Sequence, residues 1–134
     1  MAYEESLRSV SYDADATLAV WTSVPGQPGS ASPHGGKQYH FVKITGAHTV
    51  GLADADDTTV VGVMQNKPQV TGQAATVAIA GITKVVADVA LAAGDTVKVS
   101  ADGQAAKTGS GPSVGTVVLG AGAGELASVQ LTLS

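Results

Sequence analysis

From about residue 39 onward, short apolar stretches alternate with turn residues along the chain. The stretch 126–134 is the clearest, because Ala, Val and Leu occupy every second position and polar residues fill most of the others. Similar stretches lie at 39–45, 49–53, 59–64, 76–86, 95–100, 104–108 and 114–120. The pair Asp102-Gly103 is typical of a hairpin turn. About eight strands at spacings near 8–12 residues predict an all-β fold, a single small β-barrel or sandwich of β-tulip or jelly-roll type.

The segment 85–94 is ambiguous, because its apolar residues do not alternate cleanly. It is compatible with a short helix ending at Gly94, with a single helical turn, or with a buried connection between strands.

Residues 1–38 differ from the rest of the chain and predict an extended N-terminal arm. Pro25, Pro28 and Pro33, with glycines between them, exclude a regular helix or a central strand there. We therefore expect an extended loop or a flexible linker at 23–37. The sequence thus divides into an irregular N-terminal arm with a Pro/Gly-rich loop at 1–38 and a β-barrel domain at 39–134.

All aromatic side chains lie in the first 41 residues. They are Tyr3, Tyr12, Trp21, Tyr39 and Phe41. Aromatic residues are enriched at the energetic centres of interfaces. The N-terminal segment is therefore a candidate arm that docks on a neighbouring subunit or partner, and the alternative is a lid folded onto its own barrel.

Composition narrows the classes of partner and compartment. Charged residues make up 13% of the chain, against about 25% in typical globular proteins. The net charge is −4, and the basic residues are scattered, so the chain lacks a basic patch for nucleic acid. The acidic N-terminus does not fit a signal peptide, and Lys84 and Asp88 interrupt the most apolar region. We expect no membrane partner and synthesis in the host cytoplasm.

A search for catalytic and metal-binding patterns finds none. The chain has no cysteine, and His34, His40 and His48 lack the spacing of metal ligands. The glycine-rich stretch 109–115 is not followed by the residues of a phosphate loop, and Ser110 lacks the flanking pattern of a nucleophile elbow. The sequence predicts a protein that is not an enzyme and has no cofactor, metal or catalytic site.

Several short motifs in a fixed order resemble the capsid cement, or head decoration, proteins of tailed bacteriophages. These are VVGVMQNKP at 60–68, an alternating strand that ends in Gly81, Gly94-Asp95, Asp102-Gly103 and the closing strand around 129–133. The start MAYEES is also similar, whereas the family has a shorter link where this chain has residues 20–37. The similarity covers about residues 39–134 and the extreme N-terminus.

This resemblance implies a structural role on the outer surface of the mature virion. Such proteins bind the expanded shell and stabilise contacts between subunits of the major capsid protein. It also implies a homotrimer, with a dimer as the alternative. A head-fibre, receptor-binding or carbohydrate-binding module is the competing hypothesis, with Trp21 as the candidate sugar platform.

The loop Gln65, Asn66, Lys67 and Pro68 completes the candidate interface. Pro68 ends the preceding strand because it has no backbone N–H, and Asn66 and Lys67 form the polar face of the turn. The loop has two possible roles: a contact with the shell or an adjacent copy, or a turn held by hydrogen bonds within the chain.

Overall fold

The computed structural model describes residues 4–18, 37–55, 57–66, 68, 71–109 and 111–133. Its elements are β1 (Glu5–Ala14), β2 (Phe41–Gly46), β3 (Thr49–Leu52), β4 (Val60–Met64), β5 (Ala74–Val86), β6 (Thr96–Val99), the 3-10 turn η1 (Ala101–Gly103), β7 (Ala105–Ala106), β8 (Gly115–Leu119) and β9 (Leu126–Leu131). The all-β prediction is confirmed. Within these ranges, no helix is long and apolar enough to cross a membrane.

Five strands close into a barrel. The pairing order is β1-β3-β2-β4-β5, and β5 pairs in turn with β1, which completes the ring. All neighbours are antiparallel except β1 and β3, which run parallel at Asp13 and Ala14. The prediction of a small barrel is therefore correct for this half of the molecule.

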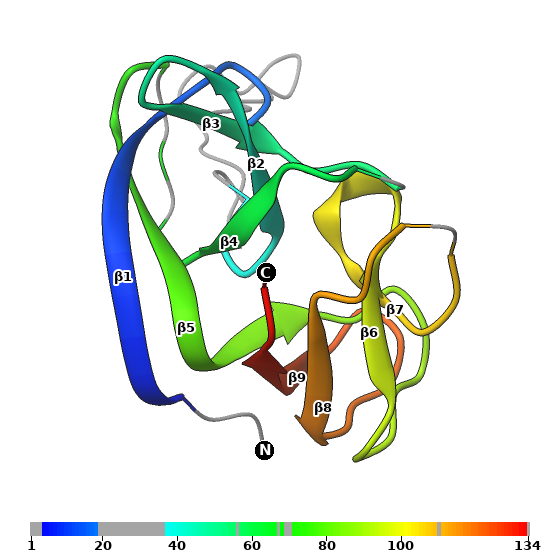
Figure 1. Cartoon of the computed structure of the whole chain (residues 1–134). Helices are drawn as coiled ribbons and strands as arrows, with labels where there is room; N and C mark the ends of the chain where they lie inside the picture. Colours follow the sequence, from blue (N-terminus) through cyan, green and yellow to red (C-terminus); the bar gives the residue numbers. More distant parts are fainter. Residues whose placement is uncertain are drawn as a thin grey trace, which may run out of the picture.

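Strand β5 leaves the barrel and continues into a second lobe (Figure 1). There it pairs with β9, and the sheet continues through β8 and β6 to β7. Ala87, just after β5, forms a parallel bridge with Ala105 of β7. This bridge connects the last strand of the second sheet to the end of β5, its first strand. Gly81 has φ +97°, a conformation that glycine adopts without a steric cost, and it stands where β5 passes from one lobe to the other.

One sequence-based expectation is corrected here, and one ambiguous segment is resolved. Glu5–Ala14, expected to be part of an irregular arm or lid at 1–38, is a barrel strand paired with β5 along its length. The reason is that Tyr12 and Ala14 point inward and supply the apolar positions that β5 needs beside it. The ambiguous segment at 85–94 contains no helix: β5 runs to Val86, and Leu91 bridges Ala121.

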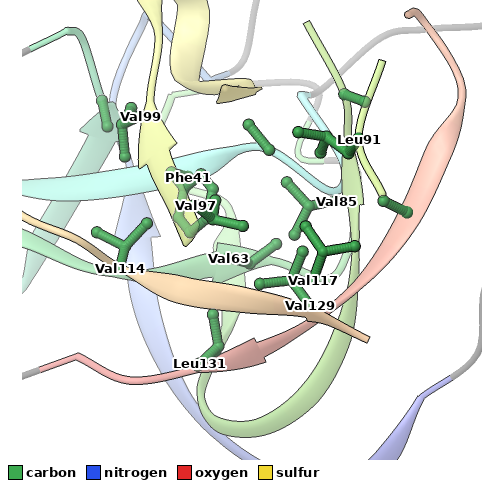
Figure 2. Packing of buried hydrophobic residues seen from close by; sticks show 14 of the residues in the cluster. Phe41, Val63, Val85, Leu91, Val97, Val99, Val114, Val117, Val129 and Leu131 are labelled. Carbon is green, nitrogen blue, oxygen red and sulfur yellow. The ribbon is translucent and has the colours of Figure 1, made fainter. Parts of the chain in front are cut away.

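The shared strands bury side chains on both faces. Phe41, Val63 and Ala78 belong to the core of the second lobe. The next or preceding residues along the same strands, Val42, Met64 and Val77, belong to the interior of the barrel. Figure 2 shows Phe41 and Val63 in the second-lobe core together with valines and leucines of β5, β6, β8 and β9. The largest side chain of that core, Phe41, is fully buried.

The barrel requires a close approach of β4 and β5 at Gly62. A Cβ placed on Gly62 would overlap the carbonyl oxygen of Ala78 and lie 2.7 Å from Cγ1 of Val77. Because the first obstacle is backbone, a side chain at this position forces the two strands apart.

We predict that Gly62→Ala lowers the free energy of unfolding by about 3 kcal/mol, because overpacking at a paired strand shifts the backbone. Gly46→Ala is the matched control, since its Cβ would meet nothing closer than 3.6 Å. The control should stay within about 0.5 kcal/mol of the parent. Urea denaturation of the three proteins measures both values, and equal stability of the two variants would contradict the close approach.

The segment before β2 joins the two lobes. The Tyr39 N–H donates to Met64 O (2.7 Å), and its carbonyl accepts from the Val86 N–H (2.9 Å). His40 follows, half-buried, with Nδ1 2.9 Å from Gln38 O. Since a carbonyl only accepts, Nδ1 carries the proton. Burial lowers the pKa of His40 below its ordinary 6.5 and the charge of Lys37 lowers it further, which together outweigh the hydrogen bond that favours the charged ring.

We predict that the protein loses stability as the pH falls below about 6.5. The unfolded chain takes up a proton at His40 near pH 6.5, whereas the folded chain does so only at lower pH, so acid favours unfolding. Full stability is present above 6.5, and the loss is complete below the lowered folded pKa. Denaturation between pH 5 and 8, a range above the ordinary pKa of the aspartates, measures it. His40→Asn, which keeps a donor toward Gln38 O, should reduce the change in the free energy of unfolding between pH 5 and 8. An unchanged pH dependence would contradict the role assigned to His40.

Candidate interaction surfaces

The loop after β4 is held by its own side chains. The Gln65 amide Nε2 donates to Val63 O (3.1 Å) and to the Thr83 hydroxyl (2.8 Å). The Asn66 amide donates to Ala74 O (2.8 Å) and accepts from the Thr76 N–H (2.9 Å). Asn66 therefore offers β5 the same donor and acceptor that a neighbouring strand would offer.

These bonds bear on the two roles left open for the loop. The side-chain N–H groups of Gln65 and both amide atoms of Asn66 are hydrogen-bonded within the chain, and Pro68 is buried. Lys67 lies outside the described residues. The described part of the loop therefore fits the intramolecular turn. Asn66 ties it to the start of β5, and the Gln65 amide ties it to Thr83, where β5 pairs with β9.

The three predicted aromatic anchors that the structure describes do not gather on one surface. Phe41 is fully buried in the second-lobe core, and Tyr12 is half-buried against the barrel interior, with its ring centroid 5.3 Å from that of His48. Tyr39 has φ +64°, unusual for a bulky residue, and its ring lies under Nζ of Lys84 at 5.8 Å. Tyr3 and Trp21 lie outside the described residues. Of the three aromatics described, only Tyr12 and Tyr39 have any accessible surface to offer a partner.

A shallow hollow of about 300 Å³ lies at one end of the barrel. Its lining includes three carboxylates and one cation: Asp15, Asp54, Asp102 and Lys43. Asp15 accepts from the Thr17 N–H and hydroxyl and from the Thr45 hydroxyl. Burial alone would raise the pKa of Asp15, but these hydrogen bonds outweigh it and hold the pKa below its usual range.

Three of the four charged groups that line this hollow, Asp15, Lys43 and Asp54, have partners within the chain. The Lys43 ammonium forms an ion pair with Asp57 at 2.9 Å. The Asp54 carboxylate accepts a hydrogen bond from the Ala55 N–H at 2.8 Å. In the described ranges, no three His, Asp or Glu side chains come together in a way that could hold a metal. Asp15 and Asp54 therefore stabilise the turns around the hollow by accepting hydrogen bonds within the chain.

The exposed apolar side chains identify a different surface, which the sequence analysis did not single out. Among the described residues, the large hydrophobic side chains that are exposed are Val10 (36%), Ile44 (41%), Val89 (37%) and Leu126 (37%). Val89 and Leu126 lie at the end of the second lobe, where the segment 87–91 runs beside 121–125. The Ala87 N–H donates to Glu125 O (2.9 Å), and the Leu91 N–H donates to Ala121 O (2.8 Å).

We call this the Val89–Leu126 patch, defined by Val89, Ala90, Ala123 and Leu126, all exposed. The charged side chains beside it along the chain, Asp88 and Glu125, are both acidic. The patch thus consists of apolar and small residues, and its charged sequence neighbours are acidic. The sequence feature that could have indicated this patch is the Ala- and Gly-rich composition of 87–94 and 120–124.

No model of a known protein family matches the chain, and no curated protein matches it. Among solved structures, the chain is similar to the N base of the head fiber protein gp8.5 of bacteriophage phi29. The two share 19% sequence identity with a TM-score of 0.60, over 95% of this chain and 97% of that chain. The likeness therefore extends over both lobes, and at this identity it establishes a shared fold.

Proposed function

We propose that this protein is a structural component of a phage head, which binds the outer surface of the expanded shell and stabilises contacts between major capsid protein subunits. The observation that carries the proposal is the likeness, over nearly the whole chain, to the base of a phage head fiber. The motif order that resembles head decoration proteins supports it independently, because that resemblance rests on residues and the likeness rests on the fold. On this proposal the protein is located on the virion and performs no chemical reaction.

The surface properties of the second lobe fit such a role. A cement protein acts by adding apolar contact area at each joint, and about 25 cal/mol per Å² makes small patches effective when they are repeated. The Val89–Leu126 patch provides an apolar surface at the end of the molecule. Its acidic sequence neighbours, Asp88 and Glu125, favour an acceptor surface that presents Lys or Arg around a small apolar centre.

A second candidate function is the base of a head fibre, in which the chain anchors an appendage. The gp8.5 likeness favours it directly, because that structure is the N base of a fiber. The two functions differ in what the head gains: a cement protein raises the resistance of the shell, whereas a fibre base only attaches. Heating heads with and without the protein until DNA is released distinguishes the two functions. A cement protein raises the release temperature, whereas a fibre base leaves it unchanged.

We predict that purified protein binds expanded shells saturably and binds compact procapsids at least tenfold more weakly, because the joints that it bridges form on expansion. Co-sedimentation with each type of shell measures this. Equal binding to procapsids, or to isolated capsid protein, would contradict the proposal.

Within that assay, Val89→Ser combined with Leu126→Ser should weaken shell binding about tenfold or more, because two half-exposed apolar side chains no longer become buried. Ile44→Ser is the matched control, since Ile44 is equally exposed but lies in the barrel. If the control weakens binding as much as the double variant, the patch is not the contact surface.

Asn66→Ala should separate stability from binding. Loss of the amide leaves Ala74 O and the Thr76 N–H without their side-chain partner, which costs about 1–2 kcal/mol of folding stability. Shell affinity measured well below the unfolding temperature should remain unchanged. A large loss of affinity in a folded variant would instead place the loop in the interface.

A further inference from the structure

Strand β1 has one edge that is paired and one edge that is largely open. Along one side it pairs with β5 from Glu5 to Asp13. Along the other side it pairs with β3, at Asp13 and Ala14. Within the described parts of the chain, no strand pairs with that second edge between Ser9 and Tyr12. In Figure 1, β1 forms the outer boundary of the barrel, with β5 on its inner side.

The hydrogen bonds at the end of β1 show which groups face the open edge. The Ala14 N–H donates toward the β5 side, to Gln73 O, whereas the Asp13 and Asp15 N–H groups donate to the other side, to His48 O and Val50 O. Backbone groups alternate between the two edges of a strand. The N–H and C=O groups of Ser9 and Ser11 therefore point to the open edge, and both residues are exposed.

Such an edge is a template for another strand, and it lacks the usual protection. The stretch Ser9–Tyr12 contains no proline and no lysine, and the register irregularities of β1 lie before it, at Glu5/Arg8 and Arg8/Ser9. The stretch is therefore regular and accessible. Val10, in its centre, is one of the large hydrophobic side chains exposed on the described surface.

We infer that this edge binds the same edge of a second copy of the chain, in an antiparallel pair with two-fold symmetry about Val10. In that register Ser9 of each copy exchanges two backbone hydrogen bonds with Ser11 of the other copy. The N–H and C=O groups of Ser9 and Ser11 at the open edge of each copy are then all hydrogen-bonded. Registers centred on Ser9 or Ser11 would need Leu7 or Asp13 as partners. The Asp13 N–H is already bonded to His48 O, and Leu7 lies beyond the register shift.

The side chains agree with this register. Val10 lies opposite Val10 of the second copy, so its exposed surface becomes covered on pairing. The regular stretch Ser9–Tyr12 contains no charged residue, so the pairing places no like charges opposite each other. Because the pairing is short, we expect self-association that depends on concentration, as in small transient interfaces. The pairing requires nothing of a shell and is independent of the proposed function.

Cross-linking tests this directly, because the chain has no cysteine. In the proposed register the two copies of residue 10 form a non-hydrogen-bonded pair about 4.5 Å apart at Cα, within the range for a disulfide. Under mild oxidation, Val10→Cys should form dimers at least tenfold faster than Val89→Cys, whose site is equally exposed but lies in the other lobe. Equal rates would overturn the inference, as would cross-linking that occurs only when shells are added.

Backbone variants test the hydrogen bonds themselves. Ser9→Pro with Ser11→Pro, in the Val10→Cys background, removes the two open N–H groups without removing a bond to β5, and should reduce the rate to that of Val89→Cys. Ser9→Ala with Ser11→Ala keeps the N–H groups and should leave the rate unchanged. If the proline variant does not fold by circular dichroism, Val10→Lys replaces it, since two lysines would oppose each other. Sedimentation velocity should then show loss of concentration-dependent association, and association equal to that of the parent would overturn the proposed pairing.

Discussion

The whole structure depends on strand β5 being apolar on both of its faces. Val77 points into the barrel and Ala78 into the core of the second lobe, so one strand serves as a wall for two separate cores. A strand that is packed on both sides leaves little room for large side chains. The many alanines and valines of the described strands fit two small cores that share strands.

The strands from residue 41 onward could be predicted because their signals are local. Alternation and turn residues such as the Asp102-Gly103 pair mark these strands, and each of the eight expected segments overlaps one of β2 to β9. The strand order was not predictable, because closure through β1–β5 and Ala87–Ala105 joins residues far apart in the sequence. Gly81 illustrates this: the stretch 76–86 predicts one strand through it, but the local pattern does not show that the positive φ of Gly81 lets this strand continue into a second sheet.

Strand β1 was missed for a related reason. Between Arg8 and Asp13 only Val10 and Tyr12 are apolar, and the remaining positions are polar because they face solvent. A strand with one open edge and one exposed face has little apolar sequence to identify it. The candidate surfaces were missed for a similar reason. The side-chain hydrogen bonds of Asn66 depend on a partner strand eight to ten residues away. Of the Val89–Leu126 patch, Leu126 begins β9 and the other residues lie in alanine-rich connections.

The two surfaces proposed here lie in different lobes, which makes them compatible. The open edge belongs to β1 in the barrel, whereas the Val89–Leu126 patch belongs to the far end of the second lobe. Pairing through β1 therefore leaves the patch on each copy exposed, and a pair of copies presents two patches. Where both patches reach the same shell, the second contact becomes intramolecular, and weak single contacts give a strong overall attachment. A small, sparsely charged protein could in this way hold a shell tightly without any large apolar face that would make it aggregate in free solution.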